Sequence, residues 1–313
     1  MNRLFVTMLA LITWAAAAGG AAAKPHADAC LQPLLAMTYN IRLDTPADGE
    51  NSWAHRRDLL IAQIQTLRPA VLGMQEVLPN QRADIEAALP NYAFIGGGRD
   101  DGKLAGEASP LAIDRRLFKI ESAGTFWLSP TPDVPSVGWD AAFRRVASWA
   151  HVRRKQDGAR LLVINTHWDH IGEQARVQSG QQLAGWIKAN LGAREALVLL
   201  GDFNTGVETP AIAQMIESAG IVPTAEGAGT LPESLAPSTF NAYDPLPAPG
   251  KVIDHIFVSK GIDIIRAMVI AQHANGRVAS DHFPVVALLG LPTKPGCPLR
   301  PAAASKANKD MTP

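Results

Sequence analysis

Polar residues able to carry acid–base or metal chemistry stand at the ends of short apolar runs in this sequence. Asn40 ends the first run, Glu76 follows the second, and His167 closes a third. Because strand ends lie at the rim of a sheet, we expect such groups to converge on one cleft. Each of them alone is typical of a cap, a turn or a hydrogen-bonded core residue, so the hypothesis depends on the whole set. That set is Asn40, Glu76, His167, Asp202, Asn204, Asp254, Asp281 and His282.

The apolar runs predict a chain of strands interrupted by a few helices. Apolar residues at helical spacing predict helices at 56–67, 81–89, 173–191 and 209–219. Strand and helix do not alternate regularly, which indicates an α+β fold of two face-packed sheets with helices outside them. The expected strands are 34–41, 71–77, 92–95, 110–113, 118–125, 147–153, 160–167, 196–200, 252–258, 264–271 and 284–289.

The polar residues belong to six short segments, which read MTYNIR, GMQEV, NTHWDH, GDFN, IDHIFVS and SDHFPV in chain order. This set resembles the endonuclease/exonuclease/phosphatase superfamily, which includes deoxyribonucleases, sphingomyelinases and inositol-polyphosphate phosphatases. The resemblance spans about residues 34–290 and points to a secreted, bacterial-type member. It implies a four-layer α/β sandwich of two packed mixed β-sheets flanked by helices, and a metal-dependent hydrolase of phosphate esters.

A divalent cation is implied by the resemblance and suits the residues present. Glu76 offers the carboxylate oxygens that Mg²⁺ and Mn²⁺ prefer, and in the family pattern Asn40 shares the ion. Asp281 completes or supports a second position. Zinc would normally require more His or Cys ligands. We therefore expect Mg²⁺, with Mn²⁺ as the second candidate, at Asn40, Glu76 and Asp281.

The remaining residues of the set supply proton transfer and charge stabilisation in this interpretation. His282 acts as the general base or holds the phosphate, and Asp254 orients its ring. Asp202 positions the attacking water, and Asn204 donates to a non-bridging oxygen. His167 stabilises the charge that develops on the scissile phosphate. The identity of the general base stays open between Asp202 and His282.

Four further residues are candidates for binding the substrate. Arg144 and Arg145 are suited to contacting a phosphate, because a guanidinium binds it through two donors; a solvated turn is the alternative. Glu107 stands where some relatives pair a carboxylate with the strand-end histidine, and a surface glutamate is the alternative there. Trp168 is expected at the mouth of the pocket.

The ends of the chain are expected to lie outside the catalytic domain, which we place at 24–291. Residues 1–23 combine a positive start, an apolar run and small residues, as signal peptides do, and the run is short for a membrane anchor. We therefore expect a periplasmic or secreted monomer, without stable membrane insertion after cleavage. Residues 292–313 are predicted to be a disordered tail. Cys30 and Cys297 either form a disulfide or remain free thiols.

The charge balance bears on the substrate. Lys and Arg number 29, and so do Asp and Glu, whereas proteins that follow long nucleic acids usually carry a basic excess. The leading function is therefore hydrolysis of a small or lipid-linked phosphate ester. The alternative is a secreted nuclease acting on DNA or RNA. A third hypothesis, a binding protein without activity, predicts that a motif residue is lost, and none is.

Overall fold

Two β-sheets packed face to face make up the centre of the computed structural model, which describes residues 31–227 and 238–292. Every strand expected from the sequence is present, and the short strand at 221–223 is additional. The strands are β1 (Leu31–Asn40), β2 (Val71–Gln75), β3 (Tyr92–Ile95), β4 (Leu111–Asp114), β5 (Phe118–Trp127), β6 (Val146–Arg154), β7 (Arg160–His167), β8 (Glu195–Asp202), β9 (Ile221–Pro223), β10 (Asp254–Ser259), β11 (Asp263–Val269) and β12 (Val285–Pro292).

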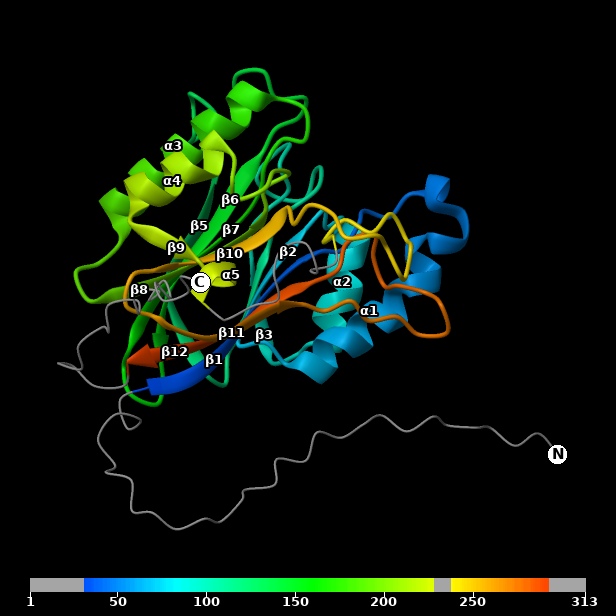
Figure 1. Cartoon of the computed structure of the whole chain (residues 1–313), viewed down its shortest axis with the longest axis horizontal. Helices are drawn as coiled ribbons and strands as arrows, with labels where there is room; N and C mark the ends of the chain where they lie inside the picture. Colours follow the sequence, from blue (N-terminus) through cyan, green and yellow to red (C-terminus); the bar gives the residue numbers. More distant parts are fainter. Residues whose placement is uncertain (1–30, 228–237, 293–313) are drawn as a thin grey trace, which may run out of the picture.

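Each sheet has six strands and contains one parallel pair. The first sheet runs β11-β12-β1-β2-β4-β3 and the second runs β5-β6-β7-β8-β10-β9. The parallel pairs are β1 with β2 and β7 with β8, and the other neighbours are antiparallel. Figure 1 shows the two sheets between helices α3 and α4 on one side and α1 and α2 on the other. A parallel pair needs a crossover, and a helical segment supplies it in each sheet.

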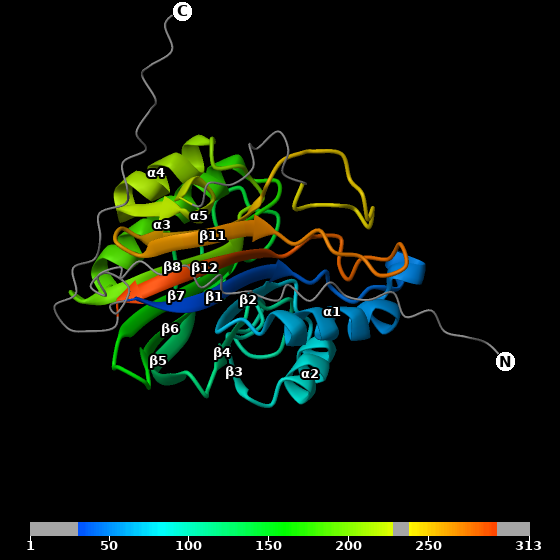
Figure 2. The same cartoon turned by 60° about the horizontal axis from the view of Figure 1, so that its bottom comes forward.

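Helices cover the outer face of each sheet, which gives four layers (Figure 2). Helices α1 (Trp53–Leu67) and α2 (Pro79–Ala88) pack on the first sheet, and α3 (Glu173–Asn190) and α4 (Pro210–Ala219) pack on the second. The short helices η2 (Pro46–Asn51) and α5 (Thr224–Gly227) were not expected from the sequence. The predicted four-layer sandwich of two mixed sheets is confirmed.

The two sheets share an intersheet core of apolar side chains, which includes Leu34 and Ala36 of β1 and Val198 and Leu200 of β8. Side chains alternate between the two faces of a strand. Continuing this alternation to the strand ends brings polar residues to the intersheet side of the same rim. These residues are Asn40 of β1, His167 of β7, Asp202 of β8 and Asp254 of β10.

A buried layer of hydrogen-bonded side chains joins the sheets just beneath that rim. The amide nitrogen of Asn165 in the second sheet donates to the carbonyls of Met74 and Pro110 in the first, at 2.7 and 3.0 Å. Gln75 donates to Asn165 Oδ1 at 2.7 Å and to Thr38 Oγ1 at 3.0 Å. Within an apolar core these bonds fix how one sheet sits on the other, because any displacement leaves buried polar atoms unpaired.

Gly73 makes room for this layer, because a Cβ there would overlap the amide group of Asn165. We expect Gly73→Ala to lower the free energy of unfolding by about 1–3 kcal/mol through overpacking. Gly185→Ala is the matched control, since Gly185 is exposed in α3 with open space around it. The Gly185→Ala variant should be more stable than wild type by roughly 0.5–1 kcal/mol. Urea unfolding of both variants checks the pair, and equal effects would show that Gly73 is not sterically required.

Several expectations for the chain ends concern residues outside the described ranges. These are the signal peptide at 1–23, Cys30 and Cys297 with their disulfide, and the tail from residue 293 onward. Within the described ranges, helices are either too short or too polar to cross a lipid bilayer.

Candidate active site

The site lies where the carboxyl ends of the two parallel strand pairs meet. His167 and Asp254 are the cross-strand partners of Asp202 in neighbouring strands, so the three form one row across the second sheet. Asn40 comes from the facing sheet and donates to Asp202 Oδ2 at 2.9 Å. Four residues that are far apart in the sequence are therefore brought into contact by the two strand registers.

Asp202 is the centre of the arrangement. Its Oδ2 lies 3.6 Å from Nε2 of His167 and 3.9 Å from Nε2 of His282, and its Oδ1 accepts from the backbone N–H of Asn204 at 2.9 Å. Burial and the neighbouring charge of Asp254 raise the pKa of the Asp202 carboxyl well above its usual range. Asp202 is thus a stronger base than an exposed aspartate and is held between two imidazoles.

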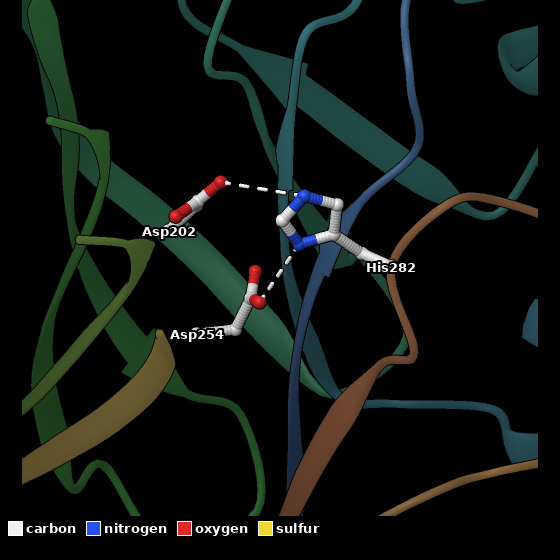
Figure 3. Close-up of side chains that lie close together, drawn as sticks. All are labelled: Asp202, Asp254 and His282. Carbon is white, nitrogen blue, oxygen red and sulfur yellow. Dashed lines mark hydrogen bonds and ion pairs between the residues drawn. The ribbon is translucent and has the colours of Figure 1, made fainter. Parts of the chain in front are cut away.

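His282 and Asp254 form a buried pair. Asp254 Oδ2 accepts from Nδ1 of His282 at 2.9 Å, so the other ring nitrogen points toward Asp202, as Figure 3 shows. Burial lowers the pKa of His282, but the carboxylates of Asp254, Asp202 and Asp281 outweigh it and raise this pKa to about 10. The ring of Phe240 packs edge-on against the imidazole with centroids 5.3 Å apart. The imidazole is therefore fixed in direction and protonated at neutral pH.

His167 has the opposite electrostatic environment. Burial, together with the positive charges of Arg145 and His282, lowers the pKa of its imidazole well below the usual value. A neutral imidazole still donates one hydrogen bond. The two histidines beside Asp202 therefore differ in charge, one neutral and one cationic.

Asn204 has a left-handed backbone, with φ of 52°, two residues after the end of β8. This conformation is uncommon for a residue with a side chain and clusters at functional sites. Its amide nitrogen donates to the carbonyl of Trp168 at 3.0 Å. The predicted donation from Asn204 to a phosphate would therefore have to use the second N–H of the same amide.

The predicted metal ligands lie on the other side of Asn40. Asn40 Nδ2 donates to Glu76 Oε1 at 3.0 Å, and Glu76 itself has a left-handed backbone with φ of 61°. One guanidinium, that of Arg42, lies 3.9 Å from Glu76 and 3.8 Å from Asp281. Burial raises the pKa of Asp281, and the charge of Glu76 raises it further. Two carboxylates that repel each other beside an amide oxygen fit a hard divalent cation such as Mg²⁺ or Mn²⁺.

A second group of donor atoms could also hold a cation. One ligand atom from each of Asp202, Asp254 and His282 lies within 4.8 Å of the others. An ion bound through Asp254 Oδ2 or through Nδ1 of His282 would break the 2.9 Å contact between them. However, Asp254 Oδ1 is buried without a hydrogen-bond partner among the described residues. On the Glu76 side, Oε1 accepts from Asn40 Nδ2 and Oε2 from the backbone N–H of Leu43. Each oxygen keeps a further lone pair for an ion, and we favour this side on that ground.

A small, half-open pocket lies beside His167. It contains three of the predicted substrate-binding residues, Glu107, Arg144 and Arg145. The expected pairing of Glu107 with the strand-end histidine is wrong. Glu107 instead forms a two-pronged ion pair with Arg99, at 2.7 and 2.9 Å, because the chain turns back at 96–107 and brings the two residues together.

The prediction that Trp168 lines the pocket mouth is also wrong. Trp168 is fully buried on the helix side of the second sheet, with its ring 4.8 Å from that of Phe203. Strand alternation is the reason: His167 faces the intersheet side, so the next residue faces α3 and α4. The role of Trp168 is in the core, where Gly180 of α3 approaches its ring.

Three residues of the site were missed by sequence reasoning. Arg42 lies against both the Glu76 and Asp281 carboxylates and is itself bound by Asp48 at 2.9 and 3.0 Å. Arg99 forms the ion pair with Glu107, and Asn165 joins the sheets beneath the site. Arg42 and Asn165 stand within the segments MTYNIR and NTHWDH and could have been found there. Arg99 lies in a glycine-rich loop that gave no signal.

Comparisons with known proteins agree with this geometry. The model of the endonuclease/exonuclease/phosphatase family matches residues 37–282. A family member from Bacteroides thetaiotaomicron is 34% identical with a TM-score of 0.79, covering 83% of this chain and 98% of that one. A mannosyl-6-phosphatase from the same organism is 34% identical with a TM-score of 0.78, covering 82% and 99%.

Two further similarities have a lower identity or cover less of the chain. The catalytic domain of human nocturnin, solved with a bound sulfate, is 19% identical with a TM-score of 0.65, covering 82% of this chain and 93% of that one. This similarity concerns the fold alone. A protein of Acanthamoeba polyphaga mimivirus is 31% identical over 160 residues, which are 49% of this chain and 59% of the viral protein. The family match and the identities above 30% over nearly whole structures lead to one conclusion: the chain belongs to the endonuclease/exonuclease/phosphatase family.

Proposed function

We propose that this protein is a divalent-metal-dependent hydrolase of small phosphate esters. The observation that carries the proposal is the position of Asp202, held 3.6 and 3.9 Å from the two histidines and bonded through Asn40 to the Glu76 carboxylate. Hydrolysis of a phosphate ester needs a base for the water, donors for the phosphate oxygens and a positive charge opposite the leaving group. Asp202 would be the base, the two histidines would be the donors, and a cation beside Glu76 would supply the positive charge. All of these groups adjoin the Asp202 carboxylate.

Glu76 and Asp281 would hold the cation, with Asn40 as a neutral oxygen donor, and Mg²⁺ is favoured over Mn²⁺. When bound, such an ion supplies charge neutralisation and orients the phosphate. Arg42 lies against both carboxylates and is clamped by Asp48. Its positive charge offsets the repulsion between the two carboxylates.

The protein groups divide the proton chemistry between them. His282 keeps its proton at neutral pH because its pKa is raised, so it donates from Nε2 to a phosphate oxygen. Asp202 accepts the proton of the attacking water, because His282 is already protonated and the raised pKa of Asp202 makes it a stronger base than an ordinary aspartate. Neutral His167 donates to an oxygen of the scissile phosphate. We therefore propose Asp202 as the general base; the sequence left the choice open between Asp202 and His282.

A small substrate is favoured over nucleic acid. The chain has no basic excess, which proteins that follow long nucleic acids usually carry. The similarity to a mannosyl-6-phosphatase at 34% identity supports a phosphomonoester. The alternative, a nuclease, has support only from fold-level similarity such as that to nocturnin.

A panel of substrates tests the function. The protein with Mg²⁺ or Mn²⁺ is assayed on p-nitrophenyl phosphate, bis-p-nitrophenyl phosphate, mannose 6-phosphate, sphingomyelin, plasmid DNA and RNA. We expect metal-dependent release of phosphate from the small monoesters, abolished by EDTA. Preferential cleavage of DNA or RNA would favour the nuclease, and no cleavage of any ester would overturn the proposal.

We expect kcat/KM to be bell-shaped in pH. The active form of Asp202 is the carboxylate, which is present above its raised pKa, so the acidic limb lies above that of an ordinary aspartate. The active form of His282 is the imidazolium, which is lost above about pH 10. Asp254→Asn removes the strongest charge that raises the pKa of His282, and the alkaline limb should move to lower pH. An unmoved alkaline limb in this variant would show that His282 does not set it.

We also propose that the enzyme acts in the periplasm or outside the cell, on the pattern of residues 1–23. Cleavage before Lys24 and a bond between Cys30 and Cys297 are its two molecular consequences. Intact-mass measurement of the protein recovered from the extracytoplasmic fraction, before and after reduction, tests both. A full-length mass in the cytoplasmic fraction alone would contradict export.

A further inference from the structure

We propose that Asp48 and Tyr243 form a clamp that keeps the guanidinium of Arg42 out of the cation site. This inference rests on the proposed metal-dependent hydrolysis and names the residues that leave the ligands of its cation free. Asp48 and Tyr243 are positioning residues in this role, because they act on the site through Arg42.

The guanidinium of Arg42 and a divalent cation require the same two carboxylates. Its NH1 lies 3.9 Å from Glu76 Oε2, and its Nε lies 3.8 Å from Asp281 Oδ2. Both distances exceed that of a hydrogen bond, and a shift of about 1 Å would close them. Glu76 Oε2 already accepts from the backbone N–H of Leu43 at 3.1 Å, so a further bond from Arg42 would use the lone pair that an ion needs.

Asp48 holds the guanidinium away from those oxygens. Its Oδ1 accepts from Arg42 NH2 at 2.9 Å and its Oδ2 accepts from Arg42 Nε at 3.0 Å, in the two-pronged geometry of a strong arginine–carboxylate pair. The hydroxyl of Tyr243 donates to the same Oδ2 at 3.1 Å. The Asp48 side chain is only 8% exposed, so water screens this pair less than it screens a surface ion pair.

The backbone of Arg42 is fixed independently of the clamp. It is left-handed, with φ of 55°, and its carbonyl accepts from Arg56 NH2 at 2.6 Å and from Gln81 Nε2 at 2.8 Å. Arg56 is buried and donates further bonds to the carbonyls of Leu43 and Ala279. With the main chain held in this way, the position of the guanidinium depends on the rotamer of its side chain. The clamp selects that rotamer.

The hydroxyl of Tyr243 reaches Asp48 from a strained turn. Ala242 and Tyr243 both have left-handed backbones, with φ of 51° and 67°, a conformation that is uncommon for residues with side chains and clusters at functional sites. The backbone N–H of Asn241, in the same turn, donates to the carbonyl of Asp281 at 2.7 Å. The turn is therefore bonded both to the clamp and to the backbone of a proposed metal ligand.

A double-mutant cycle on Mn²⁺ binding tests the clamp. Wild type, Asp48→Asn, Arg42→Met and the double variant are titrated with Mn²⁺, and electron paramagnetic resonance gives the Kd of each. We expect Asp48→Asn to raise the Kd by about 10- to 30-fold when Arg42 is present and by less than about 3-fold in the Arg42→Met background, a coupling typical of residues in contact. The reason is that the released guanidinium binds Glu76 and Asp281. Loss of a negative charge near the ion would by itself raise the Kd equally in both backgrounds, and equal effects would overturn the inference.

Two further variants separate the clamp from a general loss of structure. Tyr243→Phe removes only the hydroxyl and should raise the Kd by about 2- to 5-fold, because both bonds between Asp48 and Arg42 remain. Asp157→Asn is the matched control. Asp157 is held by Arg154 through the same two-pronged pair, at 2.9 and 2.6 Å, in the turn between β6 and β7. Its replacement should leave the Kd unchanged, and a rise equal to that of Asp48→Asn would refute the clamp.

The same titration distinguishes failure of the clamp from failure of the proposed function. If the wild-type protein binds no Mn²⁺ and its activity needs no metal, it is the metal-dependent function that fails. If Glu76→Gln weakens Mn²⁺ binding whereas Asp48→Asn does not, the cation site stands and the clamp alone is rejected.

Discussion

Asp202→Asn is expected to lower kcat for a small phosphate ester by about 10²- to 10⁴-fold, the contribution of a positioned acid or base. The amide cannot accept the proton of water, and it replaces the negative charge that lies between His167 and His282. It also places an amide where both Asn40 and the backbone of Asn204 now donate. Steady-state kinetics with saturating Mg²⁺ measure the effect.

The control for this variant is Asp114→Asn. Asp114 is a buried carboxylate paired with Arg116 at 2.6 Å, and it lies at the opposite end of the first sheet from Asn40. Its replacement should lower the melting temperature and leave kcat unchanged. If Asp202→Asn unfolds like wild type and keeps most of the wild-type kcat, the central role of Asp202 is refuted.

Glu76→Gln is expected to raise the Mg²⁺ concentration that gives half-maximal activity by at least about 10- to 100-fold, the loss seen when even an outer partner of a metal ligand is removed. The Glu76 side chain contacts Asn40 and faces Asp281 across the guanidinium of Arg42. Direct Mn²⁺ binding, followed by electron paramagnetic resonance, should weaken in parallel, since this readout does not depend on turnover.

Asp254→Asn provides the comparison, because Asp254 belongs to the other group of donor atoms, with Asp202 and His282. If the cation lies at Glu76, this variant loses kcat while Mn²⁺ binding stays close to wild type. Weakened Mn²⁺ binding in Asp254→Asn with normal binding in Glu76→Gln would move the metal to the Asp202–Asp254–His282 side.

The convergence of the site residues could be predicted from the sequence because it follows from strand ends. Asn40, His167 and Asp202 each close an apolar run, and the alternation within those runs fixes which face they share. The same rule, applied to Trp168, would have placed that residue in the core next to α3 rather than at the pocket. The motif around His167 suggested a functional role for each of its residues. The alternation of side chains along the strand predicts the position of Trp168 correctly.

The pocket could not be predicted in the same way. Arg99 and Glu107 meet because a loop turns back on itself, and Arg145 meets Asp169 across two different loops. Such contacts depend on turn geometry and have no period in the sequence. Arg42 is a further case, because its left-handed backbone, with φ of 55°, and its approach to two carboxylates have no signal in the sequence.

The hydrogen-bonded layer at Asn165 limits which parts of this fold can change among relatives. One inserted residue in β8 would move Asp202 to the helix side, and a shift of either sheet would break the bonds from Asn165 to Met74 and Pro110. The loops at 96–107 and 128–145 lie outside that layer and carry Arg99, Glu107, Arg144 and Arg145, which line the pocket beside His167. A transplant of those two loops between relatives should therefore exchange substrate preference while the hydrolytic step is inherited unchanged.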